Sequence, residues 1–156
     1  MNARPASKRE RGNALIEFAL SFFLLFAMFA GIFQFAYSFY VYNALVTAVR
    51  EGARYASLKP YDSITTTPTS AFQTAVQNMV VYGDANPAQG TPPVVAGLTG
   101  SNVVVAPTGG ASGTLTAPTQ ISVSITNFKV DAVFGSWTLT NKPNATFPYT
   151  GILTPP

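Results

Sequence analysis

Two residues near the N-terminus have types and a spacing that could do chemistry together: Gly12, and Glu17 five positions later. A basic tail ends at Gly12, and Glu17 is already inside an apolar stretch. A carboxylate at membrane depth is costly, by about 2.5–3.5 kcal/mol at mid-bilayer on insertion scales. If the chain were cut after Gly12, the new α-amino group of Asn13 would lie about one helical turn from Glu17. The spacing therefore predicts an ion pair between this ammonium group and the carboxylate, within one subunit or between neighbours.

Such a pair would fix the axial position of a helix among its neighbours, and it would add little to the stability of the bundle. A buried ion pair adds little net stability, but a lone polar group that needs one partner sets the register of packed helices. Gly12 favours cutting, because glycine offers a protease an unhindered backbone. The alternative is that Glu17, close to the cytoplasmic edge of the apolar stretch, reaches the lipid headgroups and has no partner.

Other site chemistry has little support in the composition. The chain has no histidine and no cysteine, which removes imidazole and thiolate nucleophiles and metal ligands. Residues 60–156 contain only three scattered carboxylates, Asp62, Asp84 and Asp131, without the spacing of an acid–base pair or a calcium loop. We therefore expect no enzyme, no cofactor and no metal site.

The net charge of +3 comes entirely from residues 1–12. Residues 13–156 contain five basic and five acidic side chains, so the body of the protein is neutral. A nucleic-acid-binding surface would need a basic patch, and none is expected here.

No charged residue occurs from Phe18 to Val49. The most apolar part, Phe18 to about Tyr37, has the roughly 20 residues that cross a bilayer as a helix. It is longer than the apolar region of a cleaved secretory signal, about 7–15 residues, and has no Ala-x-Ala site after it. The positive tail predicts a single span with a cytoplasmic N-terminus and contact with membrane lipid.

The helical pattern continues past this span and ends at Lys59-Pro60. Tyr37 and Tyr40 fall where an interfacial aromatic belt is expected. The small residues Ala44, Ala48 and Gly52 follow at four-residue spacing, so they form a stripe that another helix could approach closely. The alternative reading is that alanine is simply a good helix former, although a glycine inside a helix costs about 1 kcal/mol.

The pattern of residues 60–156 predicts a small α+β domain outside the cytoplasm. The chain is therefore expected to divide into a basic leader at 1–12, a membrane and assembly helix at 13–59, and this extracytoplasmic domain at 60–156. A short helix is expected from Ser70 to Tyr82 with a stop at Gly83, and a flexible Gly/Pro/Thr-rich loop at about 84–119. Three or four strands are expected. Their candidates are Val103–Val105, Ile121–Ile125, Phe128–Val130 after a turn near Asn127, Trp137–Leu139, and an edge strand or docking tail at Phe147–Leu153.

Three blocks in order, Arg11–Leu20, Phe39–Leu45 and Arg50–Ala56, resemble the TadE-like family of the bacterial tight-adherence (Tad, or Flp) pilus system. The resemblance implies a minor pilin or pseudopilin that a prepilin peptidase cuts after Gly12, so that the mature chain begins at Asn13. Glu17 would be the glutamate of the mature helix, and Phe18 with the large outer domain points to the minor class.

The resemblance also implies partners and a location. The partners would be the prepilin peptidase, other pilin-like subunits and the pilus assembly platform, and the location would be the bacterial inner membrane with possible incorporation into a surface pilus. The expected helix-packing positions are Glu17, Phe18, Tyr37, Tyr40, Ala44, Ala48 and Gly52. The alternative function is a signal-anchored extracytoplasmic binding or adhesion domain that does not polymerise.

Overall fold

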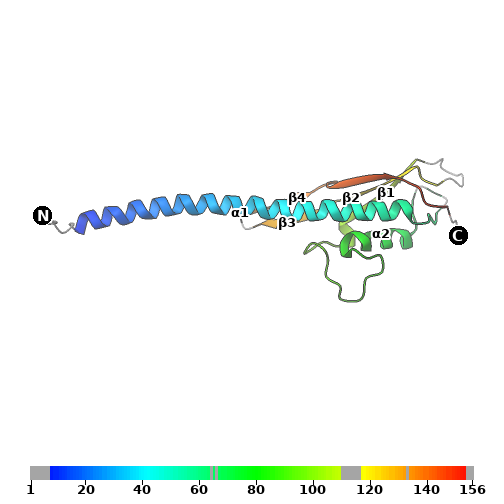
Figure 1. Cartoon of the computed structure of the whole chain (residues 1–156), viewed down its shortest axis with the longest axis horizontal. Coiled ribbons are helices and arrows are strands. Elements are labelled where there is room, and N and C mark those ends of the chain that lie inside the picture. Colours follow the sequence, from blue (N-terminus) through cyan, green and yellow to red (C-terminus); the bar gives the residue numbers. More distant parts are fainter. Residues whose placement is uncertain (1–7, 64, 66, 110–116, 133, 154–156) are drawn as a thin grey trace. The chain divides into compact units, whose positions relative to one another are not determined.

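The computed structural model describes residues 8–63, 65, 67–109, 117–132 and 134–153 (Figure 1). Two helices come first, α1 (Lys8–Leu58) and α2 (Ser70–Tyr82), followed by the short 3-10 helix η1 (Gly100–Asn102). The strands are β1 (Val103–Thr108), β2 (Gln120–Ile125), β3 (Phe128–Ala132), β4 (Gly135–Leu139) and β5 (Asn144–Pro148). This is the predicted α+β class, with a long apolar helix followed by a small β-rich domain.

The chain divides into two compact units, Met1–Tyr37 and Ser38–Pro156, and α1 contributes to both. The first unit contains the N-terminal part of this helix, and its most apolar stretch is not buried by the protein. By length and composition α1 can cross a membrane, which is compatible with a single-pass anchor. Of the leader predicted at 1–12, residues 1–7 lie outside the described residues.

The second unit contains a three-stranded antiparallel sheet in the order β1-β2-β5. Val103 pairs with Ile125 at one end of β1 and β2, and Thr108 pairs with Gln120 at the other end. The alternation predicted for β2 is confirmed, since Ile121, Val123 and Ile125 are fully buried. A Pro-containing strand belongs at an edge because proline lacks a ladder donor, and β5 is an edge strand.

A separate antiparallel pair is formed by β3 and β4. Asn127 has φ 52°, so the chain turns between β2 and β3 as the change in the apolar alternation predicts. Phe128 and Val130 are buried again, and Val130 lies opposite Trp137 in the register.

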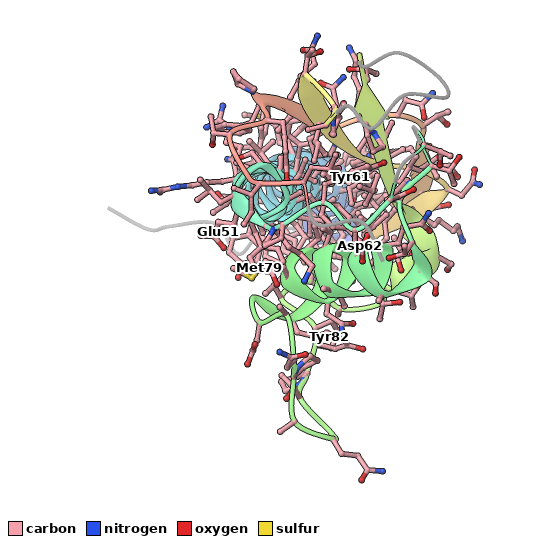
Figure 2. All side chains as sticks on the ribbon, turned by 90° about the vertical axis from the view of Figure 1, so that its right-hand side faces the viewer. Glu51, Tyr61, Asp62, Met79 and Tyr82 are labelled. Atoms are coloured by element: carbon pink, nitrogen blue, oxygen red, sulfur yellow. The ribbon has the colours of Figure 1, made fainter. Side chains whose placement is uncertain are left out.

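The second helix has the predicted bounds, Ser70–Tyr82. The Thr69 side chain accepts a hydrogen bond from the Phe72 backbone N–H (3.2 Å), so it caps the N-terminus. Gly83 has φ 73° and its N–H donates to the Met79 carbonyl, so it ends the helix in the left-handed conformation that glycine favours. In both views α2 lies beside the C-terminal part of α1 (Figures 1 and 2).

The core of this unit gathers apolar side chains from both helices and from the strands. Its largest fully buried members include Leu45, Val49, Tyr61, Phe72, Val76, Val80, Ile121, Val123 and Ile125. The C-terminal part of α1 is therefore an integral element of the domain.

Residues 84–119 contain more regular structure than a loop. The strand β1 extends to Thr108, beyond the Val103–Val105 run, and Val95 and Leu98 are buried before it. Residues 110–116 lie outside the described residues, and flexibility of this range stays a prediction. The described residues form five strands instead of three or four, because the two least regular candidates, β1 and β5, are both strands.

The segment after β5 docks on the end of α1. The N–H groups of Thr150 and Gly151 both donate to the Ser57 carbonyl at 3.0 Å, and the Tyr61 N–H donates to the Ile152 carbonyl at 2.9 Å. Carbonyls in the last turn of a helix have no partner within the helix, so the docking segment satisfies one of them. The sequence predicted an edge strand or a docking tail at Phe147–Leu153, and both occur: Phe147 and Pro148 end the edge strand β5, and the residues after them dock.

Candidate processing and assembly segment

Gly12 and Asn13 lie inside α1 and are exposed. A Cβ atom added at Gly12 would meet nothing within 4 Å, so the folded chain does not require glycine there. The backbone at these two residues is helical, so the freedom of glycine is not used in the folded chain. A protease that binds an extended substrate would therefore need this turn to unwind.

Glu17 is exposed on the same helix, four residues after Asn13. Residues four apart in a helix share a face, with about 5–6 Å between their Cβ atoms. Among the side chains that the structure describes, the one ion pair joins Lys129 to Asp131 at 2.9 Å. In this uncut chain Glu17 thus has no charged partner among those side chains.

Phe18 begins an aromatic ridge that continues along the helix. Its ring stacks on Phe22 at 6.1 Å between centroids, and Phe22 stacks on Phe26 at 6.4 Å. Phe18 was predicted from the sequence as a packing residue, whereas the ridge was not, although the four-residue spacing of the three phenylalanines signals it. This part of α1 therefore presents the Glu17 carboxylate next to a surface of stacked phenylalanine rings.

Both candidate interfacial tyrosines are exposed, Tyr37 by 42% and Tyr40 by 72%. The large apolar side chains from Leu15 to Phe39 are also exposed, in agreement with the absence of burial over the span. Nothing in the described chain covers this surface, so lipid or other protein must cover it in the cell.

The stripe of small residues lies in the second unit and is occupied there. Ala48 and Gly52 are buried, and Ala44 packs against the core. A Cβ atom added at Gly52 would lie 2.2 Å from Cγ2 of Val80 in α2. The close approach that the stripe predicted therefore occurs with a helix of the same chain, and a role of these three residues between subunits stays a prediction.

The segment joining α1 to α2 contains Tyr61, which is buried, and Asp62, which is partly buried (Figure 2). The Tyr61 ring packs edge-on against Phe72 and Tyr149, and its hydroxyl donates to the Thr65 carbonyl at 2.8 Å. Burial, with the nearby Asp62 carboxylate, raises the pKa of Tyr61, and burial likewise raises the pKa of Tyr149.

The Asp62 carboxylate accepts a hydrogen bond from the Thr69 hydroxyl at the start of α2. A negative charge there is favourable because of the helix dipole, so the contacts assign Asp62 a structural role. Among the described residues, no three His, Cys, Asp or Glu side chains come together to hold a metal ion.

Comparison with protein families shows that residues 12–54 match the family described as TadE-like protein. This range begins at the glycine of the candidate processing segment and includes nearly all of the three blocks that carry the resemblance, which is confirmed over that range. It associates the chain with the Tad pilus system in general terms. No curated protein and no solved structure matches the chain.

Proposed function

Because residues 12–54 are similar to TadE-like proteins, we propose that this chain is a minor pilin or pseudopilin of a Tad pilus. A prepilin peptidase cuts it after Gly12, and the mature chain assembles through the apolar helix into the filament or at its base or tip. The observation that carries this proposal is the exposed, uncharged surface of α1 that starts directly after Gly12 and Glu17. The protein works by packing and has no catalytic role of its own.

The location follows from charge and hydropathy. The basic tail stays in the cytoplasm, α1 crosses the inner membrane once, and the β-rich domain lies outside. The partners are the peptidase, the assembly platform and other pilin-like subunits.

Cutting requires the helix to open locally at Gly12. Glycine is about 1 kcal/mol less favourable than alanine inside a helix, so this position lowers the cost of unwinding the turn. The cut also removes the basic tail, which otherwise holds the span in the cytoplasmic leaflet.

Assembly transfers the apolar helix from lipid to a bundle of similar helices. Apolar contact alone gives little preference between lipid and a helix bundle, so shape and polar partners decide the arrangement. The ridge that begins at Phe18 supplies shape, and Glu17 pairs with the α-amino group of Asn13 to set the axial offset. Tyr37 and Tyr40 extend this contact surface, whereas Ala48 and Gly52 serve packing within the chain.

Substitution of Glu17 tests this function. Glu17→Ala should leave cutting intact but reduce co-purification with partner pilins, because the helix loses the group that fixes its register. The matched control is Glu51→Ala, which removes an exposed glutamate from the part of α1 that belongs to the domain. Full incorporation of the Glu17→Ala chain would remove the ion pair from the mechanism.

A further inference from the structure

The β3–β4 hairpin carries aromatic side chains that its own fold leaves exposed. Phe134, in the turn between the strands, is 62% exposed, and Trp137 on β4 is 41% exposed. Trp137 lies opposite the buried Val130 in the register, so it continues the apolar face of the hairpin outward from the core. An exposed Trp and an exposed Phe give this short hairpin an apolar surface, and apolar surface patches mark sites of contact with protein or membrane.

Hydrogen bonds and strand lengths place this hairpin along the second unit. At one end, Thr150 bonds to Ser57 of α1, and Tyr149 bonds to Thr119, just before β2. From there β2 and β3 run for six and five residues toward the other end, where β3 and β4 lie beyond β1 and β2 (Figure 1). At about 3.3 Å per strand residue this is roughly 35 Å, or about 23 residues of helix at 1.5 Å each. Counted from Ser57, this length is enough to span the part of α1 that belongs to the second unit, so the hairpin turn lies at the end of the unit where α1 enters it, at Ser38.

The helix surface at that level is also apolar and aromatic. Phe39 and Tyr40 are exposed by 65% and 72%, and no charged residue occurs in α1 from Phe18 to Val49. On the hairpin, Lys129 and Asp131 neutralise each other in an ion pair. The end of the unit that includes Ser38 thus presents aromatic groups from two elements and no net charge from either.

We propose that this end of the domain rests in the membrane interface, with Trp137 and Phe134 at the boundary between headgroups and acyl chains. The proposal rests on the membrane anchoring in the proposed function. The occupant is lipid because the hairpin lies at the end of the unit where α1 enters it directly after the apolar span, and because Trp and Tyr favour the headgroup level of a bilayer. The hairpin then fixes the height of the domain above the membrane before the subunit enters a filament.

Trp137 is the single tryptophan of the chain, so the native protein reports its own environment. The full chain would be reconstituted into phosphatidylcholine vesicles with bromine near the headgroup end of the acyl chains. We expect loss of Trp137 emission relative to unbrominated vesicles, and weaker quenching by aqueous acrylamide than in detergent-free urea. Unchanged emission together with full acrylamide access would overturn the proposal.

A matched control moves the tryptophan to the other end of the unit. In a chain with Trp137→Phe and Ile152→Trp, the reporter replaces an exposed residue whose carbonyl bonds to Tyr61 beyond the end of α1. Bromolipid should not quench this variant, and equal quenching of both chains would contradict the proposed placement.

An alkaline wash of the vesicles distinguishes failure of the membrane anchoring from failure of the hairpin placement. A chain that leaves the vesicles overturns the membrane anchoring and this inference with it, whereas an inserted chain with unquenched Trp137 overturns this inference alone.

Discussion

The two parts of α1 differ in what covers their apolar side chains. In residues 38–58 the apolar side chains are segregated: Val41, Leu45 and Val49 are buried in the domain, while Arg50 and Glu51 are exposed. In residues 12–37 apolar side chains surround the helix and nearly all are exposed. A helix with one apolar face packs on its own domain, whereas a helix that is apolar all round needs lipid or other helices. One uninterrupted helix therefore has two different kinds of partner.

The largest effect is expected from a substitution in residues 12–37, the part of α1 that the domain does not cover. Gly12→Leu should abolish cutting, because a bulky side chain blocks the backbone approach that a protease needs, while membrane insertion persists. The readout is the size of the protein in cells with an active prepilin peptidase. Gly31→Leu is the control, since a Cβ atom at either glycine meets nothing within 4 Å. A Gly12→Leu chain of normal mature size would contradict processing at this bond.

A substitution in residues 38–58, the part of α1 that packs in the domain, should lower the stability of the fold. Gly52→Ala would push a Cβ atom into the stiff side chain of Val80, and overpacking of this kind costs about 1–3 kcal/mol. The gain in helix propensity, about 1 kcal/mol, offsets only part of this cost. Thermal unfolding in detergent should show a lower Tm for Gly52→Ala and no loss for Gly31→Ala. An unchanged Tm for Gly52→Ala would mean that α2 does not pack closely on α1.

Much of the fold could be predicted from local pattern. The helix from Ser70 to Tyr82 has an apolar stripe, a Thr cap and a Gly stop, and all three are local features. The β2 alternation was equally readable because each residue reports its own face. The pairing of β2 with both β1 and β5 was not readable, since it depends on contacts between distant segments.

The candidate site, like the fold, could be predicted from the sequence only in part. The positions of Gly12, Glu17 and Phe18 on one apolar helix follow from spacing alone. The partner of the small-residue stripe does not, because close approach by another helix looks the same in the sequence whether that helix is α2 or belongs to another subunit. The exposed Trp137 was likewise read only as part of a strand, since nothing local distinguishes a core residue from one at a rim.

A smaller effect is expected at the aromatic ridge. Phe22→Ala removes the ring that stacks on both Phe18 and Phe26, and an aromatic pair is worth about 1.5 kcal/mol at most beyond area burial. Incorporation with partner pilins should fall several-fold, while the Tm of the domain stays that of the wild type. A fall in Tm would show that the two parts of α1 are not energetically separate.

The smallest effect concerns the segment docked on α1. Tyr149→Phe removes hydrogen bonds to the Lys59 and Ile152 carbonyls, which should cost about 1 kcal/mol. Because burial raises the pKa of Tyr149 and Tyr61 in the folded state, the unfolded tyrosines ionise first as the pH rises. The contribution of these tyrosines to the free energy of unfolding should therefore be constant below about pH 10 and fall above it, and the variant should show a smaller alkaline loss. Urea unfolding at several pH values measures both, and an equal alkaline loss in the two proteins would contradict the role of Tyr149.

The intact mass of the native protein tests the central claim most directly. The protein would be isolated from cells that express a prepilin peptidase and a Tad assembly platform. The account predicts the mass of residues 13–156, with or without a methyl group on the new N-terminus. The mass of the full 156-residue chain, from cells that cut their other pilins, would contradict it.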